Sequence, residues 1–117
     1  MKTASPSVEQ HFIGKAPEVK IIYNKLKQGV TRLGEWSEAP KKTSIHFNRK
    51  SAFAGIATRK EFLLLTIKAS NDIPSPRIHL HEQASANRWH LVTKLSRPSD
   101  VDAEVLSWLR NAYELSA

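Results

Sequence analysis

Two segments of the chain carry apolar residues at the three- and four-residue spacing of an amphipathic helix. The first runs from Pro17 to Leu33, and proline suits the first helical position because its missing N–H would be unpaired there. The second is expected to start at Ser99, which forms a capping arrangement with Asp102 three residues later, and to run to about Leu115. The pattern therefore predicts an N-terminal and a C-terminal helix.

Smaller signals surround the first helix. Ser7 followed by Gln10 resembles a capping box, which predicts one short helical turn through Phe12, ended by Gly14. Gly29 costs about 1 kcal/mol relative to alanine inside a helix, so we interpret it as a place where a neighbouring element approaches closely.

Between the helices the apolar period changes from helical to alternating. Ile45 and Phe47 fall on one side of an extended segment, and His46 falls on the other. Strands are expected over residues 43–47, 51–58, 62–69 and 89–95, with a short edge strand at 78–81 after a turn-rich stretch at 70–77. The short links predict an α+β fold: an antiparallel meander of about four to five strands, with an N-terminal and a C-terminal helix packed on one face.

The length of 117 residues corresponds to one domain, which we expect over residues 9–117 after a flexible N-terminal segment at 1–8. The longest apolar run, residues 62–65, is far shorter than the roughly 20 residues that cross a bilayer, so no membrane partner is expected. No secretory signal is recognised, and the absence of cysteine fits a cytoplasmic protein and excludes thiol chemistry.

The charge is unevenly distributed. Lys and Arg number 18 against 11 Asp and Glu, and the excess lies between residues 36 and 97, whereas the segment from 98 onward is acidic. Such a basic body favours contact with phosphate groups, including those of nucleic acid. The alternative is an ordinary solvated basic surface.

The regular pleat of the strands predicts a polar sheet face. Ser44, His46, Arg88 and His90 all alternate away from the apolar positions, and Thr66 and Lys68 do the same. A face that collects hydroxyl, imidazole and guanidinium groups can bind a small anion, and Asn87 in the adjoining loop could orient Arg88. The alternative is an open, solvent-facing side, which antiparallel sheets commonly have.

The turns carry a second basic pattern. Antiparallel pairing predicts that residues 41–42 and 59–60 lie at the same end of the sheet, and that Arg49 and Lys50 lie about 20 Å away at the other end. The end with four charges would form a rim for phosphate contacts. Lysines and arginines in turns also simply keep sheet edges soluble.

Four segments, at residues 42–47, 51–55, 85–90 and 100–104, together resemble the bacterial domain-of-unknown-function 5655 family. The resemblance runs from about Glu9 to Ser116. It implies a small domain that occurs alone or attached to larger proteins, some of them labelled predicted transport proteins or nucleases. It implies no catalytic residue and no cofactor.

We therefore expect a non-enzymatic binding module for an anionic partner, either nucleic acid or a small phosphate-bearing ligand, with no metal and no cofactor. The candidate ligand-binding residues are Lys42, Ser44, His46, Arg49, Asn87, Arg88 and His90. One alternative is a small metal-dependent or other enzyme that uses the histidines, with His79, His81 and Glu82 as further ligands. Another is a protein interaction domain that pairs through a sheet edge, and the oligomeric state is left open.

Overall fold

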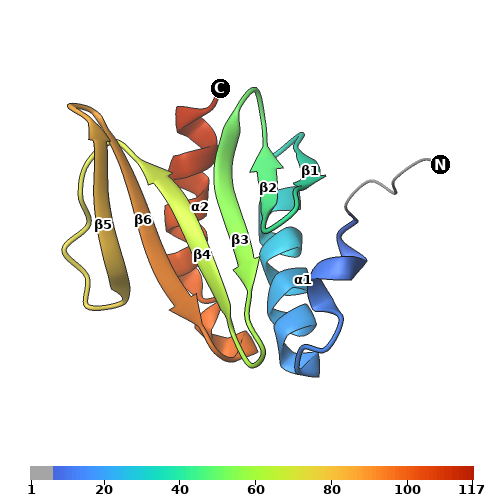
Figure 1. The fold of residues 1–117 in the computed structure, drawn as a ribbon. Helices are drawn as coiled ribbons and strands as arrows, with labels where there is room; N and C mark the ends of the chain where they lie inside the picture. The colour runs from blue at the N-terminus through green and yellow to red at the C-terminus, as the bar shows by residue number, and fades with distance from the viewer. Residues whose placement is uncertain (1–6) are drawn as a thin grey trace.

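The structure, a computed structural model, describes residues 7–117, so most of the segment predicted to be flexible lies outside the described residues. Residues 7–117 form two α-helices and six strands, whose arrangement in space is drawn in Figure 1. The elements are the 3-10 helix η1 (Glu9–Phe12), α1 (Pro17–Thr31), β1 (Ser37–Pro40), β2 (Ile45–Asn48), β3 (Ala52–Thr58), β4 (Leu63–Ala69), β5 (Ile78–Ser85), β6 (Arg88–Leu95), the 3-10 helix η2 (Pro98–Asp100) and α2 (Ala103–Leu115). The predicted α+β class and both predicted helices are confirmed.

The strands form one antiparallel sheet in the order β1-β2-β3-β4-β6-β5. The first four strands follow one another as a meander, and β6 then lies between β4 and β5. The expectation of four to five strands was too low, because β1 was not recognised. In addition, β5 continues to Ser85 instead of ending at residue 81.

Alternation along the central strands places one set of side chains in the core. Ile45 and Phe47 of β2 are fully buried, as are Leu65 of β4 and Leu91 of β6. Both helices contribute to this same core, and Figure 1 shows them on one face of the sheet, behind the strands. Among residues 7–117, no helix lies on the opposite face.

The edge strand β1 is held by polar contacts to α1. The phenol of Tyr23, in the buried stripe of α1, donates a hydrogen bond to the Glu38 carboxylate, and Lys27 Nζ lies 3.2 Å from the same carboxylate. Burial raises the pKa of the Tyr23 phenol, and the hydrogen bond to Glu38 raises it further. These contacts explain how a strand without an apolar pattern joins the sheet.

The start of α2 differs from the expectation. Asp102, not Ser99, is the N-cap: its carboxylate accepts a hydrogen bond of 3.1 Å from the backbone N–H of Val105. Ser99 lies one turn earlier, in η2. The chain turns once at η2 before α2 begins, so the cap falls three residues later than the pattern suggested.

Two smaller predictions are confirmed. Ser7 and Gln10 exchange reciprocal side-chain to backbone hydrogen bonds, both 3.3 Å, at the start of η1. Gly29 lies where α1 meets α2, and a Cβ there would come within 2.4 Å of Leu106 Cδ2. Glycine therefore permits the close approach of the two helices.

Within residues 7–117, no helix has the length and apolar character needed to cross a membrane.

Candidate ligand-binding groove on the open sheet face

The side chains that alternate away from the core meet on the face that no helix covers. The pairing of β2, β3 and β4 aligns His46 with Gly55 and Gly55 with Thr66. One step along the strands, Lys68 of β4 faces His90 of β6. Four adjacent strands therefore contribute polar side chains to one continuous surface.

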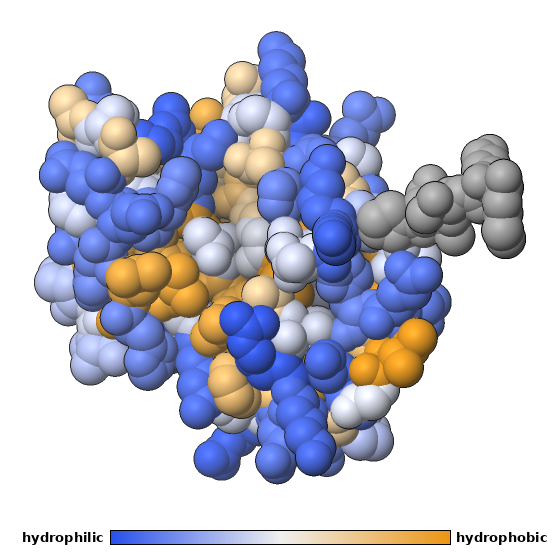
Figure 2. All heavy atoms as spheres, viewed as in Figure 1, coloured by the Kyte–Doolittle hydropathy of each residue, from blue (hydrophilic) through white to orange (hydrophobic). Residues whose placement is uncertain are grey.

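A groove of about 300 Å³ opens on this surface. Its floor is built from small residues of β3, namely Ala52, Gly55 and Ala57, and its polar lining is Ser44, His46, Thr66, Lys68 and His90. Figure 2 looks onto this face and shows apolar atoms gathered near its centre. Half-buried Leu64 and Val92, together with exposed Leu80, extend the apolar surface along β4, β6 and β5. The groove combines an apolar floor with polar sides.

Lys68 reaches into the groove from a place where the sheet opens. Strands β3 and β4 are paired only from Ala54 opposite Ile67 onward, so Lys68 lies beyond their last pair. Its ammonium donates hydrogen bonds to Ser116 Oγ at 2.8 Å and to Ser51 Oγ at 3.0 Å. Burial lowers the pKa of Lys68 from its usual value, and the nearby charge of Arg88 lowers it further.

Arg88 begins β6 and projects to the same face, one alternation before His90. Its Nη1 is shielded from solvent and has no hydrogen-bond partner among residues 7–117. A buried guanidinium nitrogen without a partner is uncommon, because leaving such a donor unsatisfied is costly. Two cations, Lys68 and Arg88, thus lie close together at one end of the groove.

His90 is placed beside a carboxylate. Its Nδ1 lies 3.6 Å from the Glu82 carboxylate, which comes from the opposite position on β5. Such a neighbour orients the imidazole with Nδ1 toward Glu82. His90 itself is part of the lining of the groove.

The structure brings together some of the predicted ligand-binding residues but not all. Ser44, His46 and His90 line the groove, and Arg88 adjoins it through Lys68. Lys42 and Asn87 lie in exposed turns and do not line it.

Arg49 has a different setting. Its guanidinium lies 4.1 Å from the centre of the Tyr113 ring, and Nη1 donates to the Tyr113 carbonyl oxygen at 3.2 Å. Arg49 therefore fastens the β2–β3 turn to α2 and does not line the groove.

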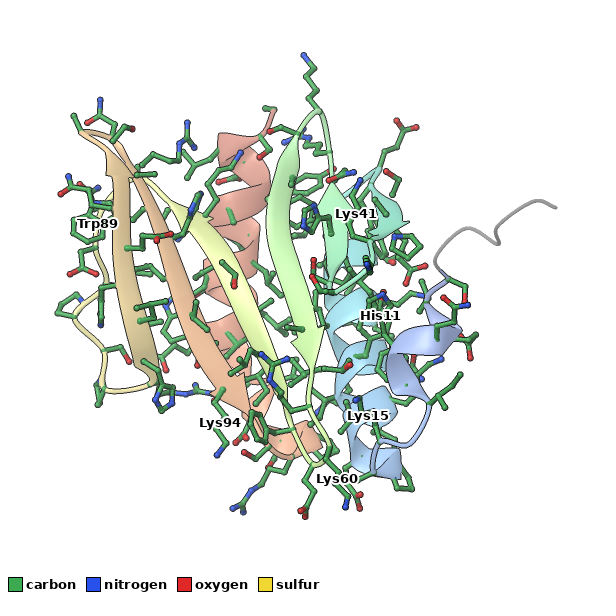
Figure 3. The ribbon with its side chains drawn as sticks, viewed as in Figure 1. His11, Lys15, Lys41, Lys60, Trp89 and Lys94 are labelled. Carbon is green, nitrogen blue, oxygen red and sulfur yellow. The ribbon has the colours of Figure 1, made fainter. Side chains whose placement is uncertain are left out.

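The basic turns do not form one rim. The register of β2 and β3 does place both turns at the same end of the sheet. However, η1 lies between them: His11 Nε2 is 2.8 Å from the Lys41 carbonyl oxygen, and Thr58 Oγ1 donates to the His11 carbonyl oxygen at 2.5 Å. Figure 3 shows His11 between Lys41 and Lys60. The predicted four-charge rim is thus divided by a segment from the N-terminal part of the chain.

The histidines do not converge as metal ligands. In the part of the chain that the structure describes, no group of three or more His, Asp or Glu side chains is arranged to hold a metal ion. His81 Nδ1 lies 2.5 Å from the Asp72 carboxylate, whereas His90 pairs with Glu82. The hypothesis of a histidine metal site is therefore not supported by the geometry of residues 7–117.

The small residues of the groove floor were not identified from the sequence. Gly55 was available as a signal, because glycine in the interior of a strand often marks the close approach of another molecule. Lys68 was placed on the correct face, but it was not selected as a binding residue because its two serine partners come from distant parts of the chain.

Fold and groove together define a class: a small α+β domain with helices on one sheet face and an open, cation-edged groove on the other. The chain belongs to the family described as "Domain of unknown function (DUF5655)", whose model matches residues 8–116. A comparison with curated proteins finds no match, and neither does a comparison with solved structures.

Proposed function

We propose that this domain is a non-enzymatic binding module that holds a small ligand, through a phosphate or carboxylate group, in the groove on the open sheet face. The observation that carries the proposal is the pair of cations at one end of the groove. Among residues 7–117, neither Lys68 nor Arg88 forms an ion pair, and Arg88 Nη1 has no hydrogen-bond partner at all.

A comparison with Arg77 shows what is unusual about Arg88. The guanidinium of Arg77 binds the carboxylates of Asp102 and Glu104 at 2.9 Å, as a structural arginine does. An anionic ligand at this end of the groove would give the Arg88 guanidinium a charged partner, and charge-assisted bonds of this kind are roughly twice as strong as neutral ones.

The positions of the two imidazoles favour binding over a shared catalytic role. His46 on β2 and His90 on β6 are separated by three interstrand spacings and by two residues along the strands, which together place their Cα atoms about 16 Å apart. A ligand can lie between them, whereas a direct proton transfer from one ring to the other needs a hydrogen-bond distance. We expect the domain to act in the bacterial cytoplasm, an expectation supported by the absence of cysteine and by the family resemblance.

Titration with inorganic phosphate, followed by backbone amide chemical shifts, tests the proposal. Shifts are expected around Lys68, Arg88 and His90, and Lys68→Met or Arg88→Met should weaken binding at least tenfold. The matched control is Arg110→Met, which removes one positive charge from the exposed surface of α2. Equal losses in all three variants, or no shifts near the groove, would show that the proposal is wrong.

Nucleic acid is the competing occupant, because the chain carries a net charge of +7. If phosphates of a duplex were bound, log affinity should fall against log salt with a slope of about −0.9 per phosphate neutralised. Binding of a random duplex that Arg110→Met weakens as much as Lys68→Met would assign the interaction to the overall charge and not to the groove.

A second candidate function is strand addition at β5. This edge strand has eight residues, seven of them exposed, and it contains neither proline nor lysine, the residues that commonly protect an edge. A partner strand would pair with the side of β5 that faces away from β6, beside the loop of residues 70–77 that Figure 1 shows next to this strand. Light scattering across a range of concentrations tests the simplest form, pairing with a second copy, and a monomer at every concentration would exclude that form.

A further inference from the structure

Gly55 lies in the interior of β3, at the centre of the groove floor. Glycine weakens a strand, because it loses more backbone freedom on folding than other residues and offers no side chain to pack. A glycine at such a position needs either a backbone conformation or a close contact that excludes a side chain.

The fold itself requires neither at Gly55. The positive-φ glycines among residues 7–117 are Gly14 and Gly34, so the backbone at Gly55 is one that any residue can adopt. A Cβ built there would meet His46 Cδ2 at 3.8 Å and Thr66 Cβ at 4.0 Å, which are ordinary contact distances. Gly29 differs, because a Cβ there would collide with Leu106. The missing side chain of Gly55 therefore serves only to deepen the groove.

The surroundings of Gly55 define the shape of the space. Ala52 and Ala57 on the same strand are the other small residues of the floor, and Thr66 lies beside Gly55 on β4. On β4 Thr66 lies between the longer side chains of Leu64 and Lys68, so the even part of the floor, which a flat ring can contact, is limited to the short residues of β3 and Thr66. The imidazoles on the neighbouring strands stand where they can meet the edges of a ring, and ring pairs of this kind are favourable at centroid separations of about 4.5–7 Å.

The size of the space limits the ligand. A volume of about 300 Å³ is at the lower end of the range of roughly 300–1,000 Å³ that small-molecule pockets have. The volume suits one or two fused rings with a single charged group, not a long chain. The charged group would lie toward Lys68 and Arg88, at the end of the groove.

We infer that the groove takes a small aromatic acid: a flat, apolar ring system that carries one carboxylate or phosphate, with the ring against Gly55 and the anion at Lys68 and Arg88. The inference rests on the proposed anion-binding function and adds the ring as the second determinant of specificity. Gly55 is then the residue that admits the ring.

Five probes separate the contributions of ring and charge. 1-Naphthoate and 1-naphthyl phosphate carry both features and distinguish the two possible anions. 2-Naphthylmethanol has the ring without charge, inorganic phosphate has the charge without a ring, and octanoate has a carboxylate on a flexible apolar chain. Calorimetric titration should give binding to at least one of the two naphthyl anions at least tenfold tighter than to each of the other three probes.

Two variants of the floor connect this preference to Gly55. Gly55→Val should weaken binding of the naphthyl anion at least tenfold, because its branched side chain fills the floor. The same variant should keep or raise the melting temperature, by a few degrees at most, since valine favours a strand. The matched control is Ala84→Val on the exposed edge strand β5, which should leave binding unchanged. Loss of binding together with undiminished stability cannot be attributed to misfolding.

The outcomes distinguish failure of this inference from failure of the proposed function. Inorganic phosphate that binds as tightly as the better bound of the two naphthyl anions would refute the role of the ring and leave the anion site standing. Octanoate that binds more tightly than the naphthyl anions would refute the inference that the ligand is flat. Equal binding of 2-naphthylmethanol, or no binding by any probe at millimolar concentration, would overturn both. Unchanged binding in Gly55→Val would show that the ring does not lie on the groove floor.

Discussion

The Asp102 carboxylate takes part in two interactions. Removing it should lower the free energy of unfolding, and each interaction should account for a separate part of the loss. The carboxylate caps α2 by accepting the Val105 N–H at 3.1 Å, and it also pairs with Arg77 Nη1 at 2.9 Å. Replacing an N-cap aspartate with alanine costs about 1 kcal/mol. The ion pair is partly exposed, so it adds about 0.5 kcal/mol. Asp102→Ala should therefore lower the free energy of unfolding by about 1.5 kcal/mol, or the melting temperature by about 6 °C.

Asp102→Asn divides the two interactions, because asparagine is also a good N-cap but carries no charge. It should cost only the ion pair, about 0.5 kcal/mol. Partial burial alone would raise the pKa of Asp102, but the hydrogen bond from the Val105 N–H and the nearby Arg77 hold this pKa below its ordinary value. A depressed pKa contributes stability that is full above the ordinary value of about 3.9 and is lost as the pH falls through the folded-state pKa.

Urea denaturation at pH 7 and at about pH 3 measures both effects. The difference between the unsubstituted protein and Asp102→Asn should be largest at pH 7 and should narrow on acidification. If Asp102→Asn were as unstable as Asp102→Ala, the larger part of the lost stability could not be assigned to capping. If the difference in stability between the unsubstituted protein and Asp102→Asn stayed constant with pH, the rest of the lost stability could not be assigned to the charge of Asp102.

Three further predictions concern α1 and are checked by the same denaturation assay. Gly29→Ala should destabilise the protein by about 1 kcal/mol, because the collision with Leu106 outweighs the gain in helix propensity; in a Leu106→Ala background, which removes the obstacle, the same change should stabilise by about 1 kcal/mol. Leu26→Ala should lower the free energy of unfolding by about 2–5 kcal/mol, because it leaves a cavity in the core. Ile21→Ala should lower it by less than about 0.5 kcal/mol, because the Ile21 side chain is 47% exposed. Tyr23→Phe should lower the free energy of unfolding by about 1 kcal/mol, because the Glu38 carboxylate loses the phenol and keeps only Lys27 beside it.

The elements that could be predicted from the sequence are those in which burial alternates or repeats along the chain. In β4 every second residue is buried, and the pattern of Leu63, Leu65 and Ile67 appears directly in the letters. The stripe of α1 is equally plain. In β1 the contacts to α1 are one hydrogen bond and one ion pair, both to Glu38, and Ser37–Pro40 carries no apolar alternation that could reveal the strand. In β5 the edge strand expected at 78–81 continues to Ser85, and because the residues after Ile78 are exposed on both faces, nothing in the order of residues 82–85 indicates this continuation.

The candidate groove shows the same limit in another form. The pleat alone placed His46 and His90 on one face, because alternation fixes the side on which a residue lies. It could not place Arg49, whose partner Tyr113 is 64 positions later in the chain and lies on another element. Nor could it show that Lys68 is fixed by Ser116, a contact that depends on the divergence of β3 and β4. Long-range side-chain contacts of this kind are decided by tertiary packing.

The position of β5 has a consequence for motion. Among residues 7–117 β5 pairs within the sheet only with β6, whereas α2 contacts β3 and β4, which lie more centrally in the sheet (Figure 1). Segments with few buried apolar contacts open at low free energy, so amide protons of β5 should exchange with solvent long before those of β4. Because β5 carries Glu82, the partner of His90, one side of the groove should loosen and re-form many times within the lifetime of the intact fold, while the opposite side, on β2 and β3, stays fixed by the core.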